Sequence, residues 1–322
     1  MLYSPIMVND MTPDILSSTL IRMKLKNSAA GAIDGKGHFA IEVPEHEGIK
    51  LYLYLKGDAW ISSAGGKSKI HVEEGGCVLM TSSKSSVVSS SSTPKKAIKL
   101  ESILKTAKNG VMTINGGGDS FSIGIHFQFE GPFSKLLFAH LPPVIYIPGH
   151  VDQSAVLRWT IERFRAESFS AHLGRSLILN HLAPIILLQI LRIYLDSAKS
   201  EQNWLVALSD PKLSKAIEAI HAEYQKSWSL EDLAKVAGMS RSGFALNFKN
   251  QVGVSPMEYL INWRIQIACE LLSSTEHNVA AVAEAVGYKS ESAFSIAFKR
   301  IVKCRPGFYQ KNFEKLNSQN IK

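Results

Sequence analysis

The C-terminal part of the chain contains one sequence pattern twice, and this repeat restricts the fold more than any other feature. SLEDLAKVAG, residues 229–238, aligns with NVAAVAEAVG, residues 278–287, and both end in glycine. Downstream, each copy carries the same five residues, and the two sets lie 50 positions apart: Phe244, Phe248, Lys249, Pro256 and Tyr259 against Phe294, Phe298, Lys299, Pro306 and Tyr309. A repeat at fixed spacing indicates two copies of one supersecondary unit.

Each copy has the form of two short helices joined by a glycine turn. The first helix begins at a capping residue, Ser229 or Asn278, whose side chain can accept hydrogen bonds from the first turn. It ends at Gly238 or Gly287, because glycine adopts the left-handed conformation that closes a helix. A second serine cap then starts the helix that carries Phe-x-x-x-Phe. This is the sequence form of a helix-turn-helix, which places its second helix in the major groove of DNA.

The second helix of each copy has one face for the core and another for a partner. Phenylalanines four residues apart share the buried face, so we expect the remaining faces to meet double-stranded DNA. Ten residues are predicted to contact it: Arg241, Ser242, Ala245, Leu246, Lys249, Lys289, Glu291, Ser292, Ser295 and Lys299. A single helix predicted over residues 257–272 is about 24 Å long, which suits two reading helices roughly 34 Å, or one DNA turn, apart.

Charge favours a polyanionic partner. The net charge is +8, and basic residues flank both proposed reading helices. A protein-binding surface exposes more apolar side chains than these helices do. The alternative interpretation is a sensor protein whose helical repeats bind a protein partner instead of DNA.

Residues 38–130 are predicted to form short strands separated by Gly or Ser turns, as in a β-sandwich or small barrel. The strand sequences are HFAIEV, KLYLYLKG, AWISS, KIHV, CVLMTS and FSIGIHFQF. The serine-rich segment 82–96 is predicted to be a loop. Two helices follow, the second over residues 175–198 with a break at Pro184. The stretch 201–211 is predicted to hold the linker to the C-terminal part.

Residues 206–313 resemble the two-motif DNA-binding domain of AraC-type transcription regulators, through LEDLAKVAGMSRSGFALNFK, GVSPMEYLINWRIQIACELL, VAAVAEAVGYKSESAFSIAFKR and RPGFY. The N-terminal part resembles the cupin-like regulatory domain of one branch of that family, through KLYLYLKGDAWI and the GGGD turn. The resemblance implies an α+β fold in three parts. These are a cupin-like β-barrel over residues 1–152, a helical dimerisation segment over 153–205, and an all-α DNA-binding domain with two helix-turn-helix motifs over 206–322.

The resemblance also implies how such a chain works. The barrel would sense a small-molecule effector, the helical segment would form a homodimer, and the DNA-binding end would activate transcription by RNA polymerase. Four positions depart from the family pattern. Leu246 and Ile296 stand where arginine is common, Tyr52 stands where a histidine is common, and Lys303 replaces a glycine. A left-handed lysine at that position would cost about 1 kcal/mol.

Four residues are candidates for the effector pocket, because polar aromatic side chains inside a barrel can orient a ligand. They are Tyr52, Tyr54, Trp60 and His126. The other interpretation is that these side chains only fill the core. No cofactor is expected.

Enzymatic and membrane functions are not favoured. A metal-dependent cupin enzyme needs clustered histidine ligands, but the sequence contains no H-x-H, and it contains no G-x-S-x-G elbow. We expect no enzymatic activity and no metal. The most apolar stretch, residues 178–195, is interrupted by polar residues and proline, so we expect a buried or subunit-facing helix and no membrane span. The start MLYSPIMVNDMTP has no secretory signal pattern, which predicts a cytoplasmic protein.

Overall fold

The computed structural model describes residues 14–63, 69–82, 84–94, 96–138, 141–149, 155–197, 203–273 and 278–319. The chain divides into two compact units. The sheet unit comprises residues 25–130, 134–200 and 317–322, and the helical unit comprises residues 1–24, 131–133 and 201–316. The boundary expected between residues 152 and 153 lies outside the described residues.

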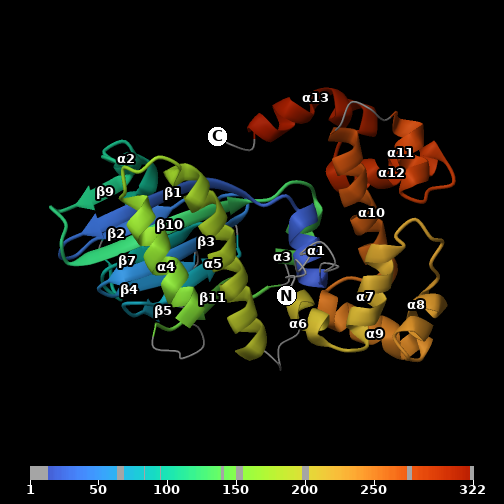
Figure 1. Ribbon diagram of the computed structural model, residues 1–322, viewed down its shortest axis with the longest axis horizontal. Coiled ribbons are helices and arrows are strands. Elements are labelled where there is room, and N and C mark those ends of the chain that lie inside the picture. The colour runs from blue at the N-terminus through green and yellow to red at the C-terminus, as the bar shows by residue number, and fades with distance from the viewer. Residues whose placement is uncertain are drawn as a thin grey trace, which may run out of the picture. The chain divides into compact units, whose positions relative to one another are not determined.

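Two β-sheets form the sheet unit (Figure 1). Sheet 1 has the order β11-β6-β3-β10-β1-β9, with bounds β1 Lys26–Gly35, β3 Ile49–Lys56, β6 Cys77–Met80, β9 Val111–Ile114, β10 Ser120–Gln128 and β11 Val144–Ile147. Sheet 2 has the order β5-β4-β7-β2-β8, with bounds β2 Ala40–Val43, β4 Ala59–Ser63, β5 Lys69–Val72, β7 Ser86–Ser89 and β8 Ile98–Lys99. Neighbouring strands are antiparallel, except for the parallel pairs β1–β9 and β2–β8.

The two sheets share one apolar core. Side chains alternate between the faces of a strand, and the inward-facing set from both sheets forms a single buried cluster. Sheet 1 contributes Tyr52, Tyr54, Val78, Met80, Met112 and Ile114, and sheet 2 contributes Ile41, Val43, Ala59, Ile61, Val72 and Val88. This arrangement confirms a β domain in the N-terminal part of the chain.

The serine-rich segment is part of this architecture, so the loop predicted over residues 82–96 is wrong for its middle. β7 pairs with β4 on one side and β2 on the other, which makes it a central strand of sheet 2. Val88 points into the core opposite Ile61. The buried Ser89 is tolerated there because its hydroxyl donates to the Ser91 carbonyl oxygen at 2.7 Å.

Two long helices, α4 (Ala155–Ser168) and α5 (Arg175–Ser197), lie against each other and cover a face of sheet 1 (Figure 1). The break expected at Pro184 does not occur, since α5 continues through it. Proline removes one helical hydrogen bond, but the residues that follow, including Ile186, Leu187 and Ile190, are fully buried. Their packing offsets that loss. Short helices α2 (Leu100–Leu104) and α3 (Phe133–Phe138) complete the chain between the strands.

The remaining helices belong to the helical unit, apart from the last residues of α13. Their bounds are α1 Ile15–Arg22, α6 Trp204–Ser209, α7 Leu213–Ala222, α8 Leu230–Val236, α9 Arg241–Val252, α10 Pro256–Ser273, α11 Val279–Ala285, α12 Glu291–Val302 and α13 Pro306–Gln319. The expected linker contains α6, whose residues Trp204 and Leu205 are buried. The boundary expected between residues 205 and 206 therefore falls inside a packed helix.

Candidate nucleic-acid interface

The first helix-turn-helix motif consists of α8, a glycine turn and α9. The hydroxyl of Ser229 accepts from the Asp232 backbone N–H at 3.1 Å, and the Asp232 carboxylate accepts from the Ser229 backbone N–H at 3.1 Å. This reciprocal cap fixes the start of α8. Gly238 has a left-handed φ of 62° at its end, and Ser240 then caps α9 by accepting from Gly243 N–H at 3.3 Å.

The second motif repeats this construction with α11 and α12. Asn278 caps α11 by accepting from Ala281 N–H at 2.8 Å, and Ser290 caps α12 by accepting from Ala293 N–H at 3.2 Å. Gly287 has a φ of 81°, and a β-carbon there would lie 2.4 Å from the Gln225 carbonyl oxygen. Glycine is therefore required at this turn for both conformation and space.

The same aromatic stack anchors each reading helix. Phe244 packs on Phe248 with ring centroids 5.5 Å apart, and Phe248 packs on Tyr259 at 5.6 Å. In the second copy, the equivalent distances from Phe294 to Phe298 and from Phe298 to Tyr309 are both 5.5 Å. All four phenylalanines are fully buried. The predicted core face of both helices is thus confirmed.

Helix α10 joins the two motifs. It packs against α8 and α9 of the first motif and against α11 and α12 of the second. Its 18 residues make it about 27 Å long at 1.5 Å per residue. Arg264 on this helix donates to the carbonyl oxygens of Tyr224 and Lys226 at 2.7 and 2.8 Å, and its guanidinium lies 5.7 Å from the Tyr288 ring centroid. This arginine has a structural role.

All ten residues predicted to contact DNA are solvent-exposed or partly exposed. The structure divides them between two surfaces: Arg241, Ser242, Ala245, Leu246 and Lys249 on α9, and Glu291, Ser292, Ser295 and Lys299 on α12 with Lys289 in the turn before it. Each surface carries two of the four cations in this set. Each surface therefore offers cations, the groups that bind phosphates, and short polar side chains, the groups that can reach base edges.

Ile296 was not among the residues predicted to contact DNA, although its side chain is 69% exposed. It is the sixth residue of α12, and Leu246, 64% exposed, is the sixth residue of α9. The 50-residue repeat spacing relates the two positions and is the signal that could have identified Ile296.

Two of the effector-pocket candidates lie together in the core of the sheet unit. Tyr52 and Tyr54 are buried on the inner face of β3, and burial raises the pKa of both phenols. The Tyr54 hydroxyl is buried without a hydrogen-bond partner. An unpaired buried hydroxyl costs free energy, so this atom could be satisfied by a ligand.

His126 lies near the end of the same face, directly across from Lys50 on β3. Its Nε2 donates to the Glu47 carbonyl oxygen at 2.5 Å, and its ring lies 5.5 Å from the ring of His46. Burial lowers the pKa of His126, lowers that of His46 to about 4 and lowers that of Lys50 to about 8. This end of the sheet therefore carries basic groups that burial favours in their neutral forms.

Trp60 faces away from Tyr52 and Tyr54. Its neighbours Ala59 and Ile61 belong to the core between the sheets, so alternation places Trp60 on the outer face of sheet 2. There its ring stacks on His71, with centroids 4.6 Å apart.

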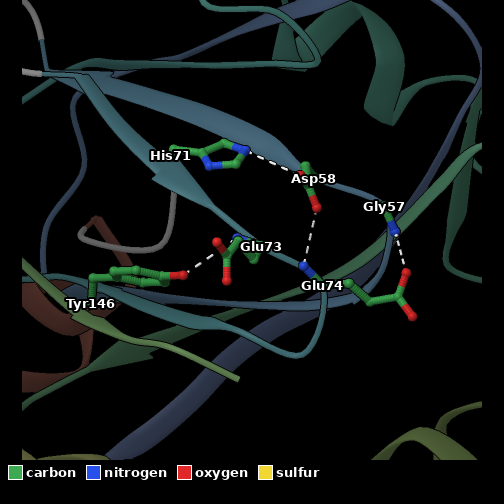
Figure 2. A network of polar contacts seen from close by, with 6 residues as sticks. All are labelled: Gly57, Asp58, His71, Glu73, Glu74 and Tyr146. Carbon is green, nitrogen blue, oxygen red and sulfur yellow. Dashed lines mark hydrogen bonds and ion pairs between the residues drawn. The ribbon is translucent and has the colours of Figure 1, made fainter. Parts of the chain in front are cut away.

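Figure 2 shows the polar network beside that stack. His71 Nε2 donates to Asp58 at 3.1 Å, and Asp58 accepts from the Glu74 backbone N–H at 3.2 Å. Glu74 in turn accepts from the Gly57 backbone N–H at 2.9 Å. These contacts position the β4–β5 hairpin. Among the residues that the structure describes, no three His, Cys, Asp or Glu side chains are grouped to hold a metal ion.

Comparisons with known proteins match the N-terminal and C-terminal parts of the chain to two different families. A Cupin family model matches residues 14–196, and a Helix-turn-helix domain model matches residues 233–312. The chain is 32% identical over 301 residues to an AraC-like transcription regulator of Streptomyces lividans, covering 93% of this chain and 98% of that protein. It is 29% identical to the HTH-type transcriptional regulator AlkR of Acinetobacter baylyi, covering 92% and 99%.

Two solved structures found by comparison are ToxT and the DNA-binding domain of AdpA. ToxT of Vibrio cholerae with a bound unsaturated fatty acid has a TM-score of 0.38 and 13% identity, covering 89% of this chain and 94% of that one. The DNA-binding domain of AdpA in complex with a target DNA has a TM-score of 0.32 and 27% identity, covering 34% and 98%.

Proposed function

Since this chain belongs to the AraC-like transcription regulators, we propose that its two helix-turn-helix motifs read two successive major-groove segments of double-stranded DNA. Membership of this family makes it a DNA-binding regulator of transcription and not an enzyme. The observation that carries the two-segment proposal is the matching burial of the two phenylalanines in α9 and in α12. Leu246 and Lys249 of α9 and the equivalent Ile296 and Lys299 of α12 are exposed, and α10 packs against both motifs.

The exposed residues of the two reading helices make different kinds of DNA contact, according to their side-chain chemistry. Lys249 and Lys299 are exposed at equivalent positions late in the two helices and approach phosphates. Ser242, Ala245, Ser292 and Ser295 are short enough to let the helix backbones enter the groove, and they contact base edges. Arg241 and Lys289 at the helix N-termini bind the flanking backbone, where positive charge attracts phosphate whatever the base sequence.

The effector binds in the core of the sheet unit, and its binding changes the population of the DNA-competent state. The support is the unpaired Tyr54 hydroxyl, with Tyr52 beside it on the same face. A small, partly apolar molecule with one polar group fits both the apolar surroundings and that hydroxyl. His126 lies on the same face of sheet 1 and can contact a longer ligand. Trp60, on the outer face, supports the hairpin instead.

The chain forms a homodimer through α4 and α5. These helices and the turn between them expose a set of large apolar side chains: Val156, Trp159, Leu173, Leu177, Ile178 and Ile185. By length and composition α5 could cross a membrane, since its most apolar window has a mean hydropathy of 1.7 and only 33% of that window is buried. Large exposed apolar surfaces often mark protein interfaces, and a second copy that covers these side chains would account for the apolar composition of α5. The dimer acts in the cytoplasm, with RNA polymerase as the partner for activation.

Binding selection followed by salt titration tests the DNA-reading function. The full-length chain is used to select duplexes from a random library, and its affinity for the selected duplex and for a scrambled duplex is measured at increasing salt. We expect a clear preference for the selected sequence and a logarithmic salt slope of about 0.9 per phosphate contacted. A chain that prefers no sequence and whose binding does not respond to salt would contradict this proposal and favour the alternative of a protein partner for these helices.

A further inference from the structure

Each reading helix exposes one large apolar side chain at the same position. Leu246 and Ile296 occupy the sixth position of α9 and α12 and are 64% and 69% exposed. A single exposed apolar side chain needs no explanation. The same exposure at the same position of both repeats points to one shared use.

Geometry directs both side chains at the partner. Leu246 lies two residues from Phe244 and two from Phe248, so it projects on the side of α9 opposite the buried face at 100° per residue. The other exposed residues of that helix are polar: Arg241, Ser242, Lys249 and Asn250. Ile296 lies in the same relation to Phe294 and Phe298, with Ser292, Lys299 and Arg300 exposed around it. Each apolar side chain therefore stands within a polar and basic rim that suits the groove of DNA.

We propose that Leu246 and Ile296 are specificity-determining residues that each contact the C5-methyl group of a thymine. This inference rests on the proposed function. The major groove presents one apolar group, the thymine methyl, and an aliphatic side chain recognises it by burial. An arginine at these positions would instead donate to guanine. Because the two residues are equivalent in the repeat, the operator should carry T·A pairs at equivalent places in its two segments, about one helical turn apart.

The test removes only the methyl groups. The full-length chain is used to select its operator, and each thymine is then replaced singly by deoxyuridine. We expect two positions about one turn apart to weaken binding roughly threefold to fivefold, the effect of one buried methyl. Leu246→Ala should abolish the response at one position and Ile296→Ala at the other. Placing 5-methylcytosine at either position should bind better than cytosine, because its methyl group occupies the same place in the groove.

Two further variants make the result specific. Lys249→Ala should weaken all duplexes equally and keep both deoxyuridine responses. Leu246→Arg should move the preference at its position from thymine to guanine. Because both side chains are exposed, the melting temperatures of the Leu246 and Ile296 variants should match the parent chain.

Outcomes for the two proposals are distinguishable. A chain that selects an operator but responds to no deoxyuridine, or responds identically in the Leu246→Ala variant, overturns the thymine-methyl inference and leaves DNA reading intact. A chain that selects no sequence overturns both.

Discussion

At the scale of single residues, the two repeats differ in the residue that ends each reading helix. Gly253 ends α9 with a φ of 86°, and Lys303 ends α12 with a φ of 67°. The lysine is thus in the left-handed conformation that the repeat position requires. Its Nζ donates to the Arg300 carbonyl oxygen at 2.9 Å, which recovers only part of the cost that a β-carbon adds there.

Lys303→Gly should therefore stabilise the chain. Removing the β-carbon relieves strain of about 1 kcal/mol, less the entropy that glycine adds to the unfolded state. Urea unfolding followed by circular dichroism measures the change. The matched control, Gly253→Lys in the first copy, should destabilise by a similar amount. If Lys303→Gly lowers stability as much as Gly253→Lys does, strain at Lys303 is not significant.

His221 is a second residue whose environment sets a measurable property. Its ring stacks on Trp263 with centroids 3.6 Å apart, and its Nε2 contacts the Tyr259 hydroxyl at 2.9 Å. Burial, and then the positive charge of Arg22, lower its pKa to about 3. An unfolded histidine has a pKa of about 6.5, so between these values the unfolded chain binds one more proton than the folded chain.

The His221 environment predicts acid sensitivity. Stability should be complete above about pH 6.5 and fall as the pH drops towards 3, with a contribution approaching 1.4 kcal/mol per pH unit, in rough terms, from this group. His221→Phe keeps an aromatic ring on Trp263 and cannot titrate. Its free energy of unfolding, measured between pH 7 and 4.5, should fall less steeply than that of the parent chain. If both chains lost stability equally as the pH fell, His221 would have the same pKa in the folded and unfolded states.

At the scale of helices and strands, an element could be predicted from the sequence when the residues that define it lie close together in the chain. Caps, glycine turns and Phe-x-x-x-Phe define the two motifs within short stretches, and the structure has helices at those places. β7 is a short strand, SVVS, within a serine-rich segment, and it becomes a central strand because β2 and β4 supply partners from distant sequence. Trp60 was expected inside as a polar aromatic residue that could orient a ligand, but the register of β4 places Ala59 and Ile61 there instead.

The buried face of α9 gives the prediction at this scale. Phe248 is fully buried between Phe244 and Tyr259, so Phe248→Ala should cost about 3 to 5 kcal/mol through lost burial and cavity formation. Ser242→Ala and Ala245→Gln change exposed or half-exposed positions of the same helix and should leave the melting temperature nearly unchanged. They should shift base preference in one segment of the operator only. Thermal melting and binding to singly substituted operators measure the two effects. Equal destabilisation by all three changes would contradict this division of faces.

At the scale of the whole molecule, a chain whose two motifs both read DNA, as proposed, would cover about two turns of the duplex, and a dimer would cover two such sites. Specific DNA binding strengthens when two linked modules engage together, because the second contact becomes intramolecular. Subunit contact through α4 and α5 would therefore affect DNA affinity without adding any DNA contact. The exposed apolar residues on those helices make this dependence testable without changing the reading surfaces.

Leu177→Glu combined with Ile178→Glu should give a folded monomer. Both side chains are exposed on α5, so the melting temperature of the sheet unit should change little, while two buried charges would strongly disfavour an apolar interface. Sedimentation equilibrium should show a dimer for the parent chain and a monomer for the double variant. The matched control is Arg192→Glu, which adds the same side chain at an exposed polar position of the same helix and should remain dimeric. The monomer should bind an isolated two-segment site as the parent does, yet lose the extra affinity for paired sites. A double variant that stays dimeric would place the subunit interface elsewhere than on this surface of α5.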